Sequence, residues 1–320
     1  MSAMKEHLCR HISVIDSYPE PEPYSLERLI AEQQGIAADC VLVTNGATEA
    51  IYLIAQASAA PSFSTQHPTP ISHFSLDGPS FAEYADACRL YGLSQRSSPR
   101  SSSHLAPRAN QALWLCNPNN PTGRVYQQEE INQFLKTFPL VIIDQSYEHH
   151  TLEHIMSPAD GIAYDNLIQI HSLTKTYAIP GLRIGYLTAQ PHLIQQIRHF
   201  VRPWSVNALA IEAAHWLLTH EVKAVTNLPA YLREAQRLRD NLNSIPDINA
   251  LPTETNFMLV RIDEPVVKKL KAYLAAHHGI LIRDASNFND LDAHYFRVAA
   301  QLPQENDLLV DAIRQFILHP

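Results

Sequence analysis

Residues 172–186 read Ser172-Leu173-Thr174-Lys175-Thr176-Tyr177-Ala178-Ile179-Pro180-Gly181-Leu182-Arg183-Ile184-Gly185-Tyr186. The run follows Leu167-Ile168-Gln169-Ile170, an apolar segment typical of a buried strand, so Lys175 emerges where that strand ends. A partly desolvated ammonium loses its charge more readily, becomes nucleophilic and can hold an aldehyde as a Schiff base. An ordinary surface lysine is the alternative, and residues elsewhere in the chain distinguish the two.

Composition restricts the class of protein. The chain has 320 residues, of which 46% are hydrophobic and 18% charged, as in an ordinary globular enzyme. Its formal net charge of -8 disfavours binding to nucleic acid or to an anionic membrane surface, because both repel an acidic protein. We therefore expect small-molecule partners and no nucleic-acid or membrane partner.

The cysteines and histidines indicate a compartment and argue against a metal. Four cysteines are widely spaced without metal-ligand spacing, which fits a reducing, cytoplasmic setting. The first ten residues lack the apolar core of a signal peptide, and no apolar run approaches the length of a membrane span. Seventeen histidines are dispersed, and pairs such as His149-His150 are adjacent rather than at helical spacing, so we expect no metal site.

Helix-like and strand-like patterns alternate along the chain, which indicates an α/β fold. The patterns predict helices over 24–33, 49–57, 206–220 and 228–242, the first with Ser25 as a candidate N-cap. They predict strands over 41–44, 112–115, 140–143, 167–170 and 256–262. Ligands of such sheets bind beyond the carboxyl ends of the strands. We expect an N-terminal arm over 1–17, a large domain over 18–220 and a small domain over 221–320.

Several strand ends carry side chains that suit one cofactor. The run Asn45-Gly46-Ala47-Thr48 joins a strand to a helix N-terminus, a junction that binds phosphate through backbone N–H groups. The hydroxyls of Ser172 and Thr174 and the cation of Arg183 suit a phosphate as well. Together with an aldehyde on Lys175, these residues predict pyridoxal 5'-phosphate.

The predicted ring site completes this set. Asp144 follows a buried strand, where its carboxylate needs a cationic partner such as a protonated pyridine nitrogen. Tyr147 and Asn120 are candidate donors to the phenolic oxygen of the ring, and Phe81 is a candidate for stacking on its face. Each residue alone has a structural alternative: a capping Asp, a Pro/Gly turn or a core Phe.

These motifs, in this order, resemble those of the fold-type I pyridoxal-phosphate enzymes: Thr44-Asn45-Gly46-Ala47-Thr48-Glu49, Pro79-Ser80-Phe81, Asn120-Pro121-Thr122-Gly123, Asp144 with Tyr147, Ser172 with Lys175 and Arg183, and Arg297. The resemblance implies a three-layer fold like that of aspartate aminotransferase, with a mostly parallel sheet flanked by helices and a smaller α+β C-terminal domain. It implies that Gly46, Ala47, Thr48, Ser172, Thr174 and Arg183 hold the cofactor phosphate. Tyr18 matches a tyrosine that reaches the phosphate in the neighbouring subunit, which implies a homodimer.

Within this family the sequence resembles two groups, the threonine-phosphate decarboxylases and the histidinol-phosphate aminotransferases. Pro180 in the lysine run and the segment Pro203-Trp204-Ser205-Val206 are similar to the decarboxylase version. In both groups an arginine pair that matches Arg283 and Arg297 receives the anions of the substrate, together with Asn120. The resemblance to decarboxylases implies release of CO₂ from L-threonine O-3-phosphate, giving (R)-1-amino-2-propanol phosphate for cobalamin synthesis.

The sequence also departs from the decarboxylase pattern. Only seventeen residues precede Tyr18, where these enzymes have a His-Gly-Gly leader and a longer arm over the substrate, and His7 or His11 is a candidate substitute. Gln145-Ser146 replaces a common Glu-Ala. Two alternatives stay open: an aminotransferase for histidinol phosphate or a similar amine, and a non-catalytic module that binds the cofactor.

Overall fold

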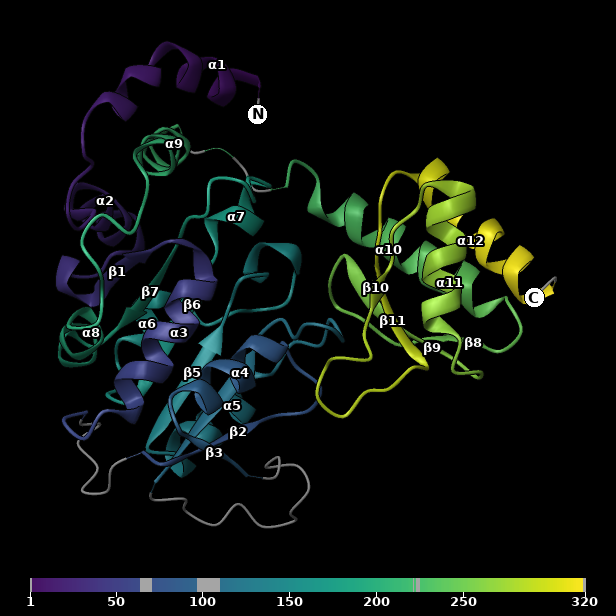
Figure 1. Ribbon diagram of the computed structural model, residues 1–320, viewed down its shortest axis with the longest axis horizontal. Helices are drawn as coiled ribbons and strands as arrows, with labels where there is room; N and C mark the ends of the chain where they lie inside the picture. Colours follow the sequence, from purple (N-terminus) through teal and green to yellow (C-terminus); the bar gives the residue numbers. More distant parts are fainter. Residues whose placement is uncertain (1, 64–70, 97–109, 221, 223–224, 319–320) are drawn as a thin grey trace.

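A large mixed sheet forms the centre of the first two thirds of the chain (Figure 1). The computed structural model describes residues 2–63, 71–96, 110–220, 222 and 225–318. The strand order is β1-β7-β6-β5-β4-β2-β3, and every neighbouring pair from β6 to β3 is parallel, whereas β7 runs antiparallel to both β1 and β6. The strands are β1 (Val41–Thr44), β2 (His73–Leu76), β3 (Ser94–Gln95), β4 (Gln111–Cys116), β5 (Leu140–Asp144), β6 (Leu167–His171) and β7 (Gly185–Ala189).

Helices cover both faces of this sheet because its central strands are apolar on both sides. Ile142 of β5 joins the core formed with α3 (Gly46–Ala59), α4 (Ala82–Leu90) and α8 (Pro191–Arg198). Val141 and Ile143 face the opposite side, where they pack against α5 (Gln128–Thr137). Burial on both faces is the usual situation of parallel strands and confirms the three-layer architecture expected from the sequence.

The C-terminal part has its own antiparallel sheet and its own core. The strand order is β10-β11-β9-β8, and α10, α11 and α12 supply the rest of the buried apolar cluster. The bounds are β8 (Ile248–Ala250), β9 (Phe257–Ile262), β10 (Arg283–Asp284), β11 (Tyr295–Ala299), α10 (Leu228–Asn243), α11 (Val267–Tyr273) and α12 (Pro303–Leu318). A smaller α+β C-terminal domain is therefore present, and the proposed boundary at residue 221 stays a prediction.

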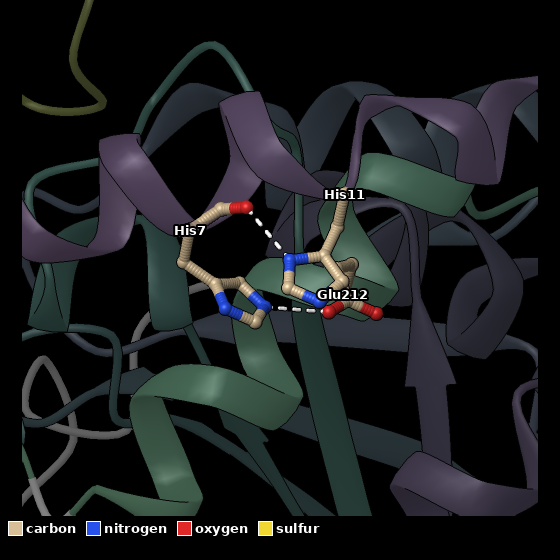
Figure 2. A group of neighbouring side chains, drawn as sticks. All are labelled: His7, His11 and Glu212. Atoms are coloured by element: carbon tan, nitrogen blue, oxygen red, sulfur yellow. Dashed lines mark hydrogen bonds and ion pairs between the residues drawn. The ribbon is translucent and has the colours of Figure 1, made fainter.

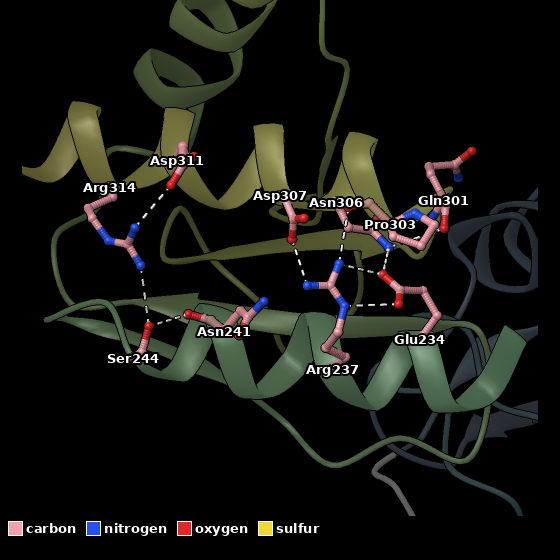
Figure 3. A network of polar contacts seen from close by, with 10 residues as sticks. All are labelled: Glu234, Arg237, Asn241, Ser244, Gln301, Pro303, Asn306, Asp307, Asp311 and Arg314. Atoms are coloured by element: carbon pink, nitrogen blue, oxygen red, sulfur yellow. Dashed lines mark hydrogen bonds and ion pairs between the residues drawn. The ribbon is translucent and has the colours of Figure 1, made fainter. Parts of the chain in front are cut away.

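A polar network joins α10 to α12 across the surface of the small domain (Figure 3). Arg237 of α10 donates to Glu234 Oε1 at 2.8 Å and to Asp307 Oδ1 of α12 at 2.6 Å. The side chain of Asn306 donates to Glu234 at 2.7 Å. The hydrogen bond from Arg237 is the main cause that holds the pKa of Glu234 below its usual value. The network fixes the helix pair behind the sheet that carries Arg283 and Arg297.

One helix cap and two helix starts differ from the sequence prediction, and the helix expected over 49–57 begins earlier, at Gly46, as α3. The first large-domain helix, α2 (Tyr24–Gln34), has Pro23 at its N-cap position, and Ser25 lies inside the helix, where its hydroxyl hydrogen-bonds His215 Nε2 at 2.9 Å. The N-cap prediction for Ser25 is therefore wrong, because Glu20 accepts the Ser25 backbone N–H from upstream. The helix expected over 206–220 begins later, as α9 (Ala208–Thr219), because the Asn207 side chain caps the Ala210 N–H.

The N-terminal residues form helices that pack on the large domain. Helix α1 (Ser2–Arg10) and a short 3₁₀ helix (Ile12–Asp16) precede Tyr18, and α1 packs along α9. The remaining short helices are α6 (Pro158–Gly161), α7 (Leu173–Thr176), 3₁₀ turns at Ala38–Cys40 and Glu148–His150, and a π turn at Leu274–His278. Among the described residues, none of the helices combines the length and the apolar character needed to cross a membrane.

Candidate functional site

A cavity of about 480 Å³ lies at the carboxyl ends of β4, β5 and β6, where the small domain faces the large sheet. This is the position at which ligands bind α/β sheets. Of the fourteen candidate residues, Gly46 and Tyr18 do not line it. The other twelve do: Ala47, Thr48, Phe81, Asn120, Asp144, Tyr147, Ser172, Thr174, Lys175, Arg183, Arg283 and Arg297. Residues more than 200 positions apart in the sequence thus meet in one cavity.

Gly46 lies directly beneath Arg183 at the start of α3. Gly46 has a φ of +80°, a conformation that favours glycine, and a Cβ added there would stand 2.8 Å from Arg183 Nη2, so the guanidinium would have to move aside. Arg183 itself has a φ of +56°, which is uncommon for a residue with a side chain. The guanidinium is therefore held over the N-terminus of α3, where the backbone N–H groups of the first turn attract anions.

Two hydroxyls from the lysine loop border the same corner of the cavity. Ser172 follows β6, and its Oγ lies 2.8 Å from Oγ1 of Thr174 on α7. Both side chains are buried and both line the cavity. Backbone N–H groups, two hydroxyls and one guanidinium make a complete donor set for a phosphate.

Asp144 ends β5 as a buried carboxylate, 4% exposed, on the floor of the cavity. Its Oδ1 accepts the backbone N–H of Ser146 at 2.8 Å, and its Oδ2 accepts the hydroxyl of Tyr84 at 2.7 Å. Among the described residues it forms no ion pair with Lys, Arg or His. A buried negative charge without a cation is costly, so the site suits a ligand that brings a positive charge.

Sequence reasoning missed Tyr84, which lines the cavity from helix α4. Its ring is fully buried and stacks on Trp114 with the ring centroids 5.4 Å apart. The sequence did contain a pattern that could have identified Tyr84, because Tyr84 lies three residues after Phe81 and therefore on the same helix face. Phe81 meets Tyr84 edge to face at 5.7 Å, so the two aromatic residues are positioned together.

Lys175 projects from α7 into the cavity, with its Nζ 5.8 Å from the centre of the Tyr147 ring. The residue is exposed in the single chain, which corrects the expectation of a partly desolvated ammonium. The reason is local: α7 has only four residues, and Lys175 leaves it toward the open cavity rather than toward the core. Tyr147 is held from its other side by Phe257, with ring centroids 4.8 Å apart.

Arg283 and Arg297 stand directly opposite each other on β10 and β11. Arg297 donates to Asn120 Oδ1 at 2.6 Å and so joins the small domain to the loop after β4. Arg283 donates to Asn287 at 3.2 Å. Like charges directly opposite on a sheet are destabilising, and among the described residues neither arginine has a carboxylate partner. The pair therefore suits anionic groups of a ligand.

Four residues singled out from the sequence lie elsewhere. Tyr18 is 85% exposed, outside the cavity of its own chain, with its ring 5.3 Å from that of Trp204. His7 and His11 lie on and just after α1 near α9, and neither lines the cavity, so they do not act there within one chain. Gln145 is buried in an amide network with Gln169, at 3.0 Å.

The family model for class I and class II aminotransferases matches residues 2–313. The chain belongs to this family. A solved structure of L-threonine-O-3-phosphate decarboxylase from Porphyromonas gingivalis is 35% identical, with a TM-score of 0.91, and the match covers 99% of this chain and 95% of that one. The threonine-phosphate decarboxylase of Salmonella typhimurium is 28% identical, over 98% of this chain and 87% of the relative. The histidinol-phosphate aminotransferase of Thermoanaerobacter pseudethanolicus is 27% identical, over 96% and 86%.

Aminotransferases of this family depend on pyridoxal 5'-phosphate, as the sequence predicted. The residues present fit this cofactor on three counts. The donors around Gly46 and Arg183 suit its phosphate, Lys175 suits its aldehyde, and Asp144 is a buried carboxylate that lacks a cation.

Proposed function

We propose that this aminotransferase-fold enzyme decarboxylates L-threonine O-3-phosphate to (R)-1-amino-2-propanol phosphate and CO₂, a reaction that serves cobalamin synthesis. The observation that carries the proposal is the pair Arg283 and Arg297, two opposed cations at the cavity. Threonine phosphate is a short substrate with two anionic groups, a carboxylate and a phosphate. The 35% identity to a decarboxylase over nearly the whole chain supports the same choice.

The cofactor would be held by residues at opposite ends of the cavity. Arg183, Ser172, Thr174 and the first turn of α3 would bind its phosphate, and Lys175 would hold its aldehyde. Asp144, oriented by the Tyr84 hydroxyl at 2.7 Å, would pair with the protonated ring nitrogen. Tyr147 and Asn120 are positioned to donate to the ring oxygen, and Phe81 to pack on the ring.

Bound pyridoxal phosphate supplies an electron-withdrawing ring that accepts the electron pair of the bond broken at the substrate's α-carbon. The residues of the chain determine which bond at the α-carbon is broken. Arg283, Arg297 and Asn120 orient the substrate so that the bond to the carboxylate is the one that breaks and CO₂ leaves. Lys175, which is exposed in the cavity, or a bound water would then deliver one proton to the same carbon.

A homodimer is part of the proposal. Tyr18 lies outside the cavity of its own chain and is available to reach the cofactor phosphate of a neighbouring subunit. Apolar side chains cluster nearby on the surface: Ile12, Ile15, Tyr18 and Trp204 are each at least half exposed. Exposed apolar side chains such as the adjacent Tyr18 and Trp204 suit a protein contact, and a second copy of the chain would cover them.

The test is an assay of CO₂ release from L-threonine O-3-phosphate by the purified enzyme, with amino-2-propanol phosphate measured as the second product. We expect equal amounts of the two products. The control is L-threonine, which lacks the phosphate and should react far more slowly at the same concentration. Equal rates with both compounds would contradict a role for the arginines in phosphate recognition, and an absence of CO₂ would contradict the decarboxylase assignment.

The second candidate is an aminotransferase for histidinol phosphate, favoured by the 27% identity over 96% of the chain. An aminotransferase converts the cofactor to its amine form with the amino donor and restores it with 2-oxoglutarate. Spectra recorded with histidinol phosphate, and then with 2-oxoglutarate, would show this cycle. A complete cycle without CO₂ release would replace the decarboxylase proposal.

A further inference from the structure

Three side chains with metal-binding atoms meet where the N-terminal helix packs on the large domain, away from the cavity (Figure 2). His7 lies on α1, His11 follows it by one helical turn, and Glu212 lies on α9. One nitrogen of each ring and one carboxylate oxygen all lie within 4.8 Å of one another. None of the three lines that cavity.

The contacts orient both rings toward the same carboxylate. His7 Nε2 lies 2.6 Å from Glu212 Oε1, and the rings of His7 and His11 stack with centroids 4.0 Å apart. His11 Nδ1 lies 2.9 Å from the backbone carbonyl of His7, so that nitrogen carries the proton and donates it. The lone pair of His11 is therefore on Nε2, the nitrogen on the far side of the ring. A backbone carbonyl that fixes the tautomer of a histidine in this way is a common feature of metal-binding histidines.

We propose that His7, His11 and Glu212 form a binding site for a divalent transition metal ion, with Zn²⁺ as the fitting species. Two imidazoles and one carboxylate are a ligand set that zinc accepts, with water completing the coordination. Zinc bonds to nitrogen are about 2.0–2.1 Å long, so two ligand atoms on one ion stand roughly 3.3 Å apart. Small side-chain rotations bring all three atoms to that separation from their present positions within 4.8 Å.

The composition of the site distinguishes it from a simple ion pair. An ion pair between His7 and Glu212 needs only two residues, and it leaves His11 without a role although its ring is stacked beside His7. His7 and Glu212 are half-buried and His11 is exposed, so an ion can enter from solvent along the His11 side. The i, i+4 spacing of His7 and His11 presents both rings on one helix face. Sequence reasoning compared only adjacent histidine pairs and predicted no metal, so it missed this pair.

Such a site would act on the arm that carries Tyr18. The ion would join α1 to α9 through ligands more than 200 residues apart and so restrain the chain just before Ile12–Asp16 and Tyr18. A ligand that binds the folded chain and not the unfolded one raises thermal stability. The role is therefore structural, and catalysis in the distant cavity should not require the ion.

The experiment is calorimetric titration of the chelator-treated holoenzyme with ZnCl₂, together with its melting temperature in zinc and in EDTA. We expect one Zn²⁺ per chain and a higher melting temperature in zinc. His11→Gln should weaken zinc binding at least about tenfold, because it removes one ligand and leaves the His7–Glu212 contact in place. Since His11 is exposed, this variant should fold and keep its cofactor absorbance.

His199→Gln is the matched control. His199 is also exposed, and its Nδ1 also faces the carbonyl four residues earlier, at 2.7 Å from Gln195, but it has no part in the cluster. It should bind zinc as the wild type does. Equal zinc affinity of His11→Gln and wild type, or a stoichiometry well below one, would overturn the proposal and leave only the ion pair. Anomalous scattering at the zinc edge in soaked crystals must place the ion between the three residues, and density elsewhere would also overturn it.

Discussion

The hydroxyl of Tyr84 donates a hydrogen bond to Oδ2 of Asp144 at 2.7 Å, with both side chains buried. Burial is the main cause that raises the pKa of Tyr84 well above its usual value, and the adjacent Asp144 charge adds to it. Tyr84 therefore stays protonated and keeps donating. A fixed donor at one oxygen and the Ser146 N–H at the other hold the Asp144 carboxylate in a single orientation.

Replacement of Tyr84 by Phe should test this relationship. The variant keeps the ring that stacks on Trp114 and removes only the donor, so a hydrogen bond to a charged group is lost, at a cost of about 1.5–3 kcal/mol. We expect a lower free energy of unfolding in urea and a lower kcat. Tyr126→Phe, which removes another buried hydroxyl of the large domain, is the control for stability loss alone. Unchanged kcat in Tyr84→Phe would show that the hydroxyl does not orient Asp144.

Lys175→Ala should abolish covalent attachment of the cofactor. The side chain is exposed, so its loss should leave the fold and the melting temperature of the cofactor-free protein nearly unchanged. Borohydride reduction followed by mass spectrometry should find cofactor mass on the wild type and none on the variant. Lys269→Ala, another exposed lysine, should behave as the wild type does. A reducible bond that persists in Lys175→Ala would assign the attachment to another lysine.

Arg183 and Arg283 should affect different ligands. Arg183 lies over the first turn of α3, so Arg183→Ala should weaken cofactor binding, whereas Arg283→Ala should raise KM for threonine phosphate. The loss of a charge-assisted contact costs roughly 2–5 kcal/mol. Cofactor titration and initial rates on both variants measure the two effects. If Arg283→Ala lost the cofactor and kept its KM, the division of roles would be reversed.

Gly46→Ala and Gly35→Ala form a matched pair. Both glycines have positive φ, +80° and +67°, so both substitutions carry backbone strain of about 1 kcal/mol or more. Only at Gly46 would the new Cβ meet Arg183 Nη2, at 2.8 Å, whereas nothing lies within 4 Å at Gly35. We expect both variants to lose stability and only Gly46→Ala to lose cofactor affinity. Equal cofactor affinity in the two would contradict the placement of the phosphate beside Gly46.

His150 should make stability depend on pH. Burial, with the neighbouring charges of His149 and Lys175, lowers the pKa of His150 from 6.5 to about 4. The folded chain keeps His150 neutral, so below pH 6.5 the unfolded chain binds a proton that the folded chain does not. The contribution of His150 to the free energy of unfolding is fully present above pH 6.5 and is lost as the pH falls toward 4. His150→Phe should flatten this part of the unfolding profile, and His199→Gln should not.

The sequence predicted the residues at the strand ends of the site better than the residues that support them. Lys175, Asp144 and Ser172 could be placed because each follows a run of apolar residues that forms a central strand, and strand ends converge. Tyr84 could not be ranked above other aromatic residues, because its partner Asp144 lies 60 positions away. The packing of Ser2–Arg10 as a helix along α9 depends on contacts between segments about 200 residues apart, which a local sequence pattern does not reveal.

The pairing of β1 with β7 governs when the cofactor site can form. Val41 pairs with Thr188, and Thr44 pairs with Gly185. A Cβ added at Gly185 would stand 2.8 Å from the backbone nitrogen of Ala47. A ribosome releases β1 early and β7 much later, so the nascent chain carries β1 without its partner while the intervening strands emerge. The corner that includes Ala47 closes only after residue 189 has left the ribosome. At the phosphate site proposed above, capture of the cofactor would therefore be a late event in the synthesis of this protein.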